Sequence, residues 1–212
     1  MELPELRREY LQMGLREADV AADPIAQFRV WFDQAVQAGI PDPDGMTLAT
    51  ATPDGFPSSR IVLLKGLSDA GFVFFTSYEG RKARDLAANP RAALCFYWSQ
   101  LERQVRVEGV VELTSPVESD TYWATRPRGS QVSAWASHQS DVVARREVLE
   151  SRLAELETKF TGRDVPRPVM WGGYRVKPGL VEFWQGRANR LHDRLRYRRL
   201  ESGTWLIERL AP

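Results

Sequence analysis

Short runs of β-branched and aromatic residues alternate with turn signals through the middle of the chain. Five of these runs are predicted to be strands: Met46–Thr52, Ser58–Leu67, Gly71–Ser77, Ala92–Trp98 and Arg103–Leu113. The turn signals between them are Pro53-Asp54-Gly55, Asp69-Ala70-Gly71 and Asn89-Pro90. Four later runs are also predicted to be strands: Trp171–Val176, Leu180–Gln185, Arg190–Arg198 and Thr204–Arg209. Closely spaced strands of this kind indicate an antiparallel sheet or barrel.

Helical spacing of apolar residues marks segments on both sides of the strands. Asp23 can cap a helix whose first turn suits Pro24, and Gly39 ends it. The apolar stripe of that helix comprises Phe28, Trp31, Phe32 and Val36. Shorter helices are predicted at Gly80–Ala88, Pro116–Thr125 and Ser130–Ser137. Asp141 is expected to cap a longer helix with one apolar face, formed by Leu149, Leu153, Leu156 and Phe160.

These elements predict one α+β domain over residues 1–212, mainly β, with helices flanking a barrel. The first 20 residues form an arm, helix-like over Pro4–Arg16, of a type that is usually solvated or mobile. Apolar content of 43% and charged content of 27% are ordinary for a globular protein.

Charge and cysteine content exclude several classes of partner. The net charge of +1 gives no global field that would recruit nucleic acid, so any anion site must be local. Apolar stretches such as Gly71–Phe75 are too short to cross a membrane, and the N-terminus lacks the plan of a signal peptide. Cys95, the one cysteine, lies in an apolar run and is expected to be buried. We therefore expect no disulfide, no metal site and a cytoplasmic location.

One predicted strand carries a row of like charges. From residue 190 onward, Leu191, Leu195 and Tyr197 alternate with polar positions. The polar positions are Arg190, His192, Arg194, Arg196 and Arg198. Such a row is costly unless anions or solvent meet it. Either a solvated outer face or a flat anionic ligand beside Trp184 explains the pattern.

Cations and hydroxyls elsewhere fall into two clusters. Arg60 and Lys65 bracket an apolar strand, and Arg81-Lys82 opens a helix, where backbone donors favour an anion. The second cluster surrounds Pro127 and contains Tyr122, Arg126, Arg128 and Ser130. Gln104 and Gln139-Ser140 could contact a polar ring edge. Two clusters suggest two phosphates, and the scarcity of general bases suggests a cofactor that carries the chemistry. A solvated surface is the alternative for each pair alone.

Eleven short motifs occur in order from about Leu6 to Pro212. They are Leu-Arg-Arg-Glu-Tyr (6–10), Asp-Pro (23–24), Arg-Ile-Val-Leu-Leu-Lys (60–65), Gly-Arg-Lys-Ala (80–83), Leu-Glu-Arg-Gln-Val-Arg (101–106), Arg-Pro-Arg-Gly-Ser-Gln (126–131), Ser-His-Gln-Ser (137–140), Trp-Gly-Gly (171–173), Glu-Phe-Trp-Gln-Gly (182–186), Arg-Leu-His-Asp-Arg (190–194) and Arg-Leu-Ala-Pro (209–212). Together they resemble the pyridoxamine (pyridoxine) 5′-phosphate oxidase family over nearly the whole chain.

The resemblance implies a split β-barrel homodimer that binds FMN at the subunit interface. Residues implied to contact the flavin or its phosphate are Arg60, Ile61, Val62, Leu63, Phe75, Thr76, Arg81, Lys82, Gln104, Gln139, Ser140, Trp184 and Arg194. Some of these would come from the partner subunit. Many relatives have Tyr where this chain has Phe75, which puts a hydroxyl contact in doubt and leaves a backbone contact possible.

The implied reaction is FMN-dependent oxidation of pyridoxamine and pyridoxine 5′-phosphates to pyridoxal 5′-phosphate in vitamin B6 biosynthesis and salvage. Dioxygen is the acceptor and hydrogen peroxide the second product. The substrate phosphate is implied to bind Lys65, Tyr122, Arg126 and Ser130, while Arg7 and Tyr10 of the arm close the site. Arg190 and His192 are implied to lie over the pyridine ring as the catalytic residues. His192 is either a proton acceptor or an orienting donor.

Two rival functions are weighed against this expectation. Another split-barrel redox enzyme, using FMN or a deazaflavin, would lack the second phosphate cluster around Arg126. A non-enzymatic binder of flavin or vitamin phosphate would need no group over the ring, whereas Arg190 and His192 are both present.

Overall fold

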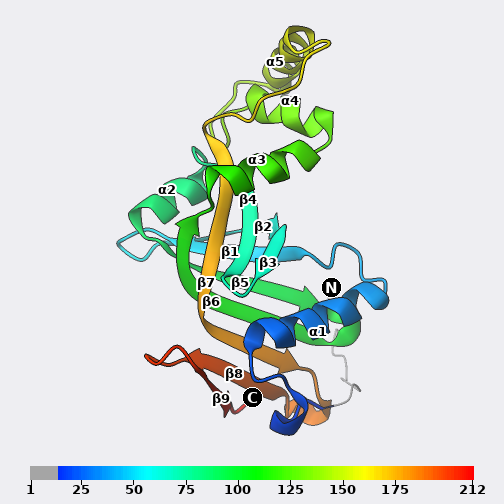
Figure 1. The fold of residues 1–212 in the computed structure, drawn as a ribbon, viewed down its shortest axis with the longest axis vertical. Coiled ribbons are helices and arrows are strands. Elements are labelled where there is room, and N and C mark those ends of the chain that lie inside the picture. The colour runs from blue at the N-terminus through cyan, green and yellow to red at the C-terminus, as the bar shows by residue number, and fades with distance from the viewer. Residues whose placement is uncertain (1–13) are drawn as a thin grey trace, which may run out of the picture.

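A curled antiparallel sheet forms the centre of the structure, a computed structural model that describes residues 14–212 (Figure 1). Nine strands build it: β1 (Gly45–Ala51), β2 (Pro57–Leu63), β3 (Gly66–Ser68), β4 (Gly71–Ser77), β5 (Arg91–Trp98), β6 (Arg103–Leu113), β7 (Trp171–Gln185), β8 (Asp193–Arg199) and β9 (Trp205–Arg209). Their order is β2-β1-β5-β6-β7-β4-β3, and β8 and β9 extend the sheet from β7. The result is a half-barrel, as expected for a mainly β, α+β fold.

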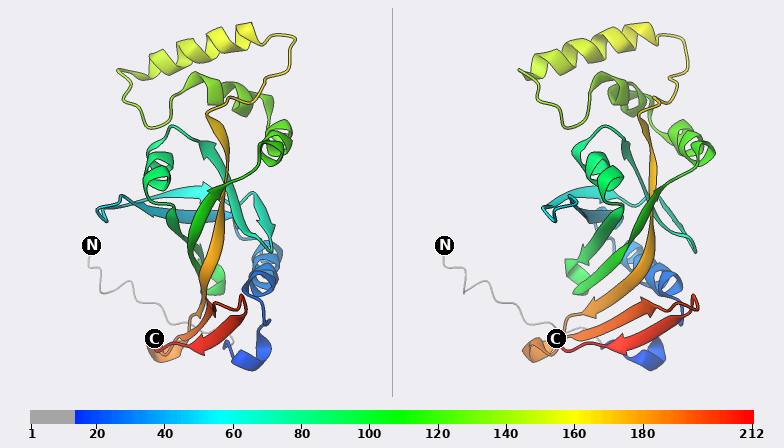
Figure 2. Two further views of the ribbon diagram at one scale, coloured as in Figure 1. Left: turned by 60° about the vertical axis from the view of Figure 1, so that its left-hand side comes forward. Right: turned by 90° about the vertical axis from the view of Figure 1, so that its left-hand side faces the viewer.

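Five α-helices accompany the sheet in the described part of the chain. They are α1 (Pro24–Gln37), α2 (Arg81–Ala88), α3 (Pro116–Thr125), α4 (Arg128–Ala136) and α5 (Arg146–Lys159). α1 lies across one side of the sheet, whereas α3, α4 and α5 gather at one end of the molecule (Figures 1 and 2). Within the described residues, no helix is long and apolar enough to cross a membrane.

The paired strands β6 and β7 are the axis of the fold. β7 runs along the molecule from α3–α5 at one end to β8 and β9 at the other (Figures 1 and 2). The β6–β7 register shifts between Glu108 and Gly109, where Pro178 lies opposite. A Cβ on Gly109 would stand 2.0 Å from the Lys177 carbonyl oxygen, so the close approach at this bulge requires glycine.

The main core is aromatic and joins α1 to the sheet. Asp23 accepts hydrogen bonds from the Ile25 and Ala26 N–H groups at 2.8 and 3.0 Å, which confirms the predicted helix cap. Phe28 is fully buried, and its ring centroid lies 4.9 Å from those of both Phe72 and Phe96. Edge and tilted contacts of this kind add to the stability gained by burial.

A smaller core lies beneath α3, α4 and α5. Its buried members are Trp123, Val132, Phe160, Val165 and Trp171. Trp123 donates through its indole N–H to the Val165 carbonyl oxygen at 2.8 Å, which fixes α3 to the segment before β7. Phe75 and Tyr122 pack against this core from one side.

Three predicted strands have other boundaries in the structure. The predicted strand Ser58–Leu67 is two strands, because β2 pairs with β1 whereas β3 pairs with β4 across the half-barrel. Leu64 and Lys65 make the change of partner, donating backbone hydrogen bonds to Asp44 and Val73 at 2.8 Å. Conversely, Trp171–Val176 and Leu180–Gln185 are one strand, β7, because the bulge accommodates Pro178 without ending the ladder.

The predicted strand Arg190–Arg198 also starts too early. Ala188–Arg190 is a short 3-10 turn in which Asn189 and Arg190 have φ of 56° and 60°. Positive φ interrupts extended backbone, so β8 begins only at Asp193. Arg190 and His192 therefore lie in a loop and not on the face of the strand.

Helix starts and burial show three further differences. α5 begins at Arg146 with Arg145 at its N-cap, so Asp141 lies outside the helix that it was expected to cap. α4 begins at Arg128, two residues before the predicted start at Ser130. Cys95 lies in β5 as expected but is half-buried. Most of the predicted helix Pro4–Arg16 lies outside the described residues.

The aromatic core generates a stability prediction. Phe28→Ala removes a fully buried ring and should lower the free energy of unfolding by about 3–5 kcal/mol. Val30→Ala on the same helix, where the side chain is 48% exposed, should change it by less than about 0.5 kcal/mol. Urea denaturation of both variants measures the difference, and equal effects would contradict the proposed core.

Candidate functional site

A compact polar cluster forms where α2 meets β4 and the segment after α4. Lys82, which is buried, donates through Nζ to Thr76 Oγ1 at 3.0 Å and to Gln139 Oε1 at 2.5 Å. Thr76 Oγ1 also donates to Gln139 Oε1 at 3.1 Å. The backbone N–H of Arg81 donates to Ser140 Oγ at 3.2 Å. Five residues expected to contact FMN therefore lie together: Thr76, Lys82 and Gln139 bond to one another, and Arg81 bonds to Ser140.

Local backbone geometry sets the shape of this cluster. Gly80 is the N-cap of α2, and a Cβ there would lie 2.5 Å from Gln139 Oε1. The glycine lets the amide of Gln139 approach the helix start, next to Lys82. Ser140 has a φ of 75°, which turns its hydroxyl back toward the Arg81 N–H. The first turn of α2 directs its N–H groups and the positive end of its dipole toward the same region.

Arg60 brings a third cation close to this cluster. Its Nη1 donates to Thr50 Oγ1 at 2.8 Å, and its Nη2 donates to Ser58 Oγ at 2.9 Å. Burial lowers the pKa of Lys82, and the Arg60 charge lowers it further. The pKa of Arg60 is likewise lowered, first by burial and also by the charge of Arg81. Burial is thus the main cause of both shifts, Asp85 partly offsets it for Arg60, and a bound anion would stabilise these desolvated cations.

A second cluster combines an arginine with stacked aromatic rings. Phe75 stacks on Tyr122 with centroids 4.0 Å apart, and on Trp171 at 5.7 Å. The guanidinium of Arg126 lies 4.5 Å from the Trp171 ring centroid and 5.1 Å from that of Trp123. Arg126 Nη1 is buried and, within the described residues, has no hydrogen-bond partner. Burial lowers the pKa of Arg126, as expected for a desolvated cation.

The remaining residues of the predicted substrate set are less closely grouped. Ser130 lies half-buried in the first turn of α4. Lys65, at the change from β2 to β3, donates to Asp44 at 2.6 Å in a partly exposed ion pair. Arg128 donates to the carbonyl oxygens of Phe160 and Arg163 at 2.5 and 2.8 Å, so it caps the end of α5 and takes no part in the Arg126 cluster.

Gln104, Trp184 and Arg194 form a row on one face of the sheet. Gln104 of β6 is registered with Trp184 of β7, and Trp184 with Arg194 of β8. Arg194 donates to Glu182 through Nε at 2.8 Å and through Nη2 at 3.2 Å. Arg196 donates to Glu208 from Nη2 at 2.8 Å. The predicted row of positive charge was expected to need anions or solvent. In the structure, glutamates of the same chain pair with two of its arginines.

His192 and Arg190 lie beside this row, in the loop before β8. The rings of His192 and Trp184 have centroids 4.8 Å apart. The Arg187 N–H donates to His192 Nδ1 at 3.1 Å, so Nδ1 is an acceptor and the neutral ring carries its proton on Nε2. Burial lowers the pKa of His192, and the adjacent charge of Arg190 lowers it further.

The expected substrate residues are divided between two parts of the chain. Tyr122 of α3, Ser130 of α4 and Arg126 between these helices lie at one end of the long axis, whereas β8, which follows Arg190 and His192, lies at the other end (Figure 1). One chain therefore does not bring the phosphate-binding and ring-binding groups together. Arg7 and Tyr10 lie outside the described residues.

The face that carries Gln104 and Trp184 is partly apolar. Strand registers place Ile61, Tyr97 and Val110 on the same face, with exposures of 67%, 55% and 53%. Arg60 is on the opposite face, in register with buried Leu48. Exposed aromatic and aliphatic side chains on a sheet face are typical of a surface that another subunit covers.

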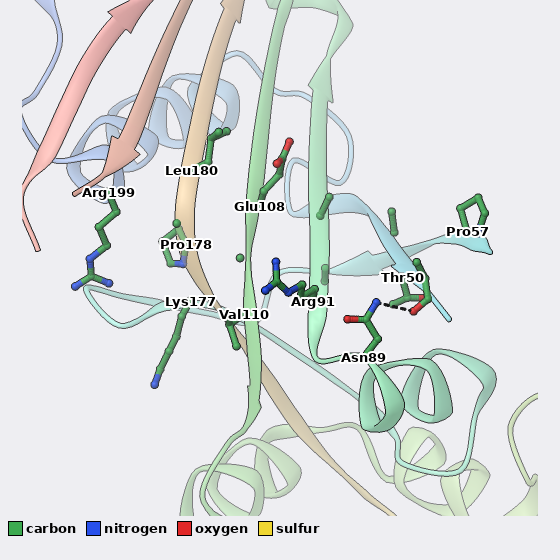
Figure 3. A pocket seen from close by; sticks show the side chains of 16 residues that line it. Thr50, Pro57, Asn89, Arg91, Glu108, Val110, Lys177, Pro178, Leu180 and Arg199 are labelled. Atoms are coloured by element: carbon green, nitrogen blue, oxygen red, sulfur yellow. Dashed lines mark hydrogen bonds between the residues drawn. The ribbon is translucent and has the colours of Figure 1, made fainter. Parts of the chain in front are cut away.

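A cavity of about 720 Å³ lies on the sheet at the β6–β7 bulge (Figure 3). Glu108, Val110, Pro178 and Leu180 line it, and Arg91, Lys177 and Arg199 stand around it. Among the described residues of its lining there is none expected to hold flavin or substrate. The cavity therefore does not mark the candidate site in a single chain.

Three residues that contact the candidate site were not predicted from the sequence: Thr50 and Asp85, which support Arg60, and Glu182, which pairs with Arg194. Thr50 Oγ1 donates to Asp85 Oδ2 at 2.7 Å, and both side chains are buried. A buried Asp on the apolar side of a predicted helix was the available signal for Asp85. Glu182 lies two positions before Trp184 in a quoted motif, so strand alternation placed both on one face.

Two family models match most of the chain. The model described as "Pyridoxamine 5′-phosphate oxidase" matches residues 32–160, and "Pyridoxine 5′-phosphate oxidase C-terminal dimerisation region" matches residues 171–212. Pyridoxine/pyridoxamine 5′-phosphate oxidase of Rubrobacter xylanophilus is 61% identical, over 100% of this chain and 97% of that protein. The protein of the same name from Cupriavidus metallidurans is 59% identical, over 100% and 99%.

Solved structures agree with these matches. PhzG from Burkholderia lata, in complex with tetrahydrophenazine-1-carboxylic acid, is 33% identical with a TM-score of 0.90, covering 97% of this chain and 100% of that chain. A pyridoxamine 5′-phosphate oxidase-related, FMN-binding protein from Nostoc punctiforme shares the fold at a TM-score of 0.71 and 20% identity, covering 88% and 98%. The matched dimerisation region supports a homodimer. The chain therefore belongs to the pyridoxamine 5′-phosphate oxidase family of FMN-dependent oxidoreductases, which confirms the family, the fold class and the cofactor expected from its motifs.

Proposed function

We propose that the protein oxidises pyridoxamine 5′-phosphate and pyridoxine 5′-phosphate to pyridoxal 5′-phosphate, with FMN as cofactor and dioxygen as acceptor. The observation that carries this proposal is the pairing of two anion-binding clusters within one family fold. Arg60 and Lys82 make one cluster, and Arg126 among its aromatic rings makes the other. A phosphorylated cofactor and a phosphorylated substrate together require two such sites.

The first cluster fits the phosphate of FMN. Arg60, Arg81 and Lys82 supply positive charge, while Ser140 and the start of α2 add hydroxyl and backbone donors. Ile61, Val62 and Leu63 follow Arg60 along β2, and Phe75 and Thr76 precede Lys82, so both strands can edge the isoalloxazine ring. When bound, FMN supplies two-electron redox chemistry, with hydrogen peroxide as the product of dioxygen.

The second cluster suits the substrate phosphate. Arg126 is held over two indole rings, and its buried Nη1 is oriented without a protein acceptor in the described part of the chain. A desolvated guanidinium of this kind binds a dianion strongly and with bidentate geometry. Lys65, Tyr122 and Ser130 are proposed to complete the contacts, and Arg7 and Tyr10 to cover them.

Arg190 and His192 are proposed to act at the pyridine ring. The hydrogen bond from the Arg187 N–H keeps His192 Nδ1 unprotonated, so Nε2 is a donor in the neutral ring. This arrangement favours an orienting role for His192 over that of a base at Nδ1. Arg190 supplies a positive charge that can orient the substrate and stabilise developing negative charge.

The site is proposed to be shared between two subunits. Gln104, Trp184 and Arg194 lie on the partly apolar sheet face, and Arg60 faces the other way. A second copy that covers this face would bring its own Arg60 and Arg126 clusters to the Trp184 row. The matched dimerisation region includes β7 and β8, which carry Trp184 and Arg194, and the loop between them, which carries His192.

The structural likeness to PhzG supports a second candidate substrate class. That protein was solved with a tricyclic carboxylic acid, and Arg126 could also bind a carboxylate. A protein of this class would oxidise the tricyclic acid without needing a substrate phosphate.

Peroxide formation distinguishes the two candidates. The FMN-loaded protein should release hydrogen peroxide with pyridoxine 5′-phosphate, and much less with pyridoxine or with a partly reduced phenazine carboxylic acid. Equal rates with the phosphorylated and unphosphorylated vitamin would contradict a role for the second cluster. Peroxide from the tricyclic acid alone would favour the second candidate.

Arg126 should affect substrate binding. Loss of a charge-assisted hydrogen bond costs about 1.5–3 kcal/mol, so Arg126→Gln should raise KM for pyridoxine 5′-phosphate by about 10- to 150-fold. Turnover should fall less, if the contact is similar in the ground and transition states. Steady-state kinetics measure both, with Arg146→Gln, at a side chain that is 84% exposed, as the control. An unchanged KM would remove Arg126 from the site.

The lowered pKa of His192 generates a pH prediction. Its neutral form persists below the ordinary histidine value of about 6.5, so activity that needs neutral His192 should fall only below that pH. His192→Asn keeps an acceptor in place of Nδ1 and should remove this acidic limb from the kcat profile. A limb that persists in the variant, with near-normal turnover, would show that titration of His192 does not control the rate.

A further inference from the structure

A buried carboxylate lies beside the cationic cluster that is proposed to hold the FMN phosphate. Asp85 is on the inner side of α2, with 7% of its side chain exposed. A negative charge close to an anion site weakens phosphate binding unless it has another role. The proposed chemistry of FMN and substrate gives no use to this carboxylate, so its position needs a separate explanation.

Thr50 links Asp85 to Arg60. The hydroxyl of Thr50, buried on β1, donates to Asp85 Oδ2 at 2.7 Å and accepts from Arg60 Nη1 at 2.8 Å. Asp85 Oδ2 also lies 3.8 Å from Arg60 Nη2. The hydroxyl can donate one hydrogen bond, and the Asp85 carboxylate, a strong acceptor, receives that bond. The lone pairs of Thr50 therefore remain directed at Arg60.

Other contacts fix the same guanidinium from the strand side. Arg60 Nη2 donates to Ser58 Oγ at 2.9 Å, and Nη1 has a longer contact of 3.3 Å with the Leu48 carbonyl oxygen. α2 is attached to β1 by a further bond of 3.1 Å, from Asn89 Nδ2 to the Ala51 carbonyl oxygen. Helix and strand are thus held together next to Arg60, and the Thr50–Asp85 pair is the polar part of that junction.

We propose that Thr50 and Asp85 are positioning residues that hold the Arg60 guanidinium ready for the FMN phosphate, and that they thereby set the preference for FMN over riboflavin. This inference rests on the proposed FMN site. Arg60 carries its full charge with or without its partners, but a free arginine side chain must lose rotamer freedom when phosphate binds. A guanidinium already oriented in the unliganded protein avoids that loss.

Thr50 can be tested with a matched pair of variants. Thr50→Val keeps the shape and removes the hydroxyl, whereas Thr50→Ser keeps the hydroxyl. Proteins loaded with FMN or riboflavin are diluted in series, and the recovery of flavin fluorescence gives each dissociation constant. Thr50→Val should weaken FMN binding at least about tenfold, the effect of one lost hydrogen bond to a charged group. Riboflavin binding should stay within about twofold of the unmodified protein, and Thr50→Ser should restore FMN binding.

Asp85→Asn distinguishes a positioning role of Asp85 from plain repulsion between its charge and the phosphate, because the two predict opposite changes in FMN affinity. Removing a nearby negative charge should tighten FMN binding if Asp85 only repels the phosphate. It should weaken FMN binding, and leave riboflavin binding unchanged, if Asp85 orients Arg60 through Thr50. The positioning role therefore requires a lower FMN-to-riboflavin preference in Asp85→Asn as well as in Thr50→Val.

The remaining outcomes overturn the inference. Tighter or unchanged FMN binding in Asp85→Asn would do so, and so would equal weakening of FMN and riboflavin, which indicates a general loss of structure. A failure of Thr50→Ser to restore binding would show that the hydroxyl is not the relevant group. The unmodified protein is a separate test: if it does not prefer FMN over riboflavin, the proposed cofactor site itself is wrong.

Discussion

The ladder between β6 and β7, with its bulge at Gly109, is the constraint on which the rest of the structure depends. β7 pairs with β6 on one side and with β4 and β8 on the other, so all parts of the sheet are attached to it. The close approach of Gly109 to the Lys177 carbonyl oxygen lets this long strand bend with the half-barrel. Because β7 is long, it places the Arg126 cluster near its start and Trp184 near its end. The residues of the proposed site therefore lie in two separate parts of one chain, and we propose that a second copy brings them together.

Two kinds of cation can be distinguished in the described part of the chain by what surrounds their charge. Arg194 and Arg196 pair with Glu182 and Glu208, so the row of positive charge on β8 is neutralised within the chain. Arg60, Lys82 and Arg126 are different, because burial lowers the pKa of all three, and the charge of Asp85 offsets this only in part for Arg60. Cations that the fold desolvates are suited to bind anionic ligands. Burial alone does not define such a site, because it also lowers the pKa of Arg103, which donates to Gln185 and lies over Trp31.

Much of this arrangement could be predicted from the sequence, because local patterns and ordered motifs determine it. The cap at Asp23, the sequence of strands and the contacts among Thr76, Lys82, Gln139 and Ser140 all follow from such signals. The strand predictions that failed depended on pairing with strands that are distant in the chain. The strand break at Leu64 and Lys65 reflects a change of pairing partner, and the continuity of β7 through Pro178 reflects a bulge at Gly179, which the register with β6 skips. Positive φ at Asn189 and Arg190 moved two expected catalytic residues off the strand, and the alternation of side chains did not reveal it.

We propose that each active site combines Arg60 of one subunit with Arg194 of the other. Mixing subunits that carry Arg60→Ala with subunits that carry Arg194→Ala tests it most directly. Each variant alone should be nearly inactive, since both of its sites lack one contact. Random pairing makes half of the dimers mixed, and each mixed dimer has one intact site, so the mixture should recover roughly a quarter of the unmodified activity. A mixture that stays as inactive as its components, although exchange of subunits is verified by mass, would contradict the shared site.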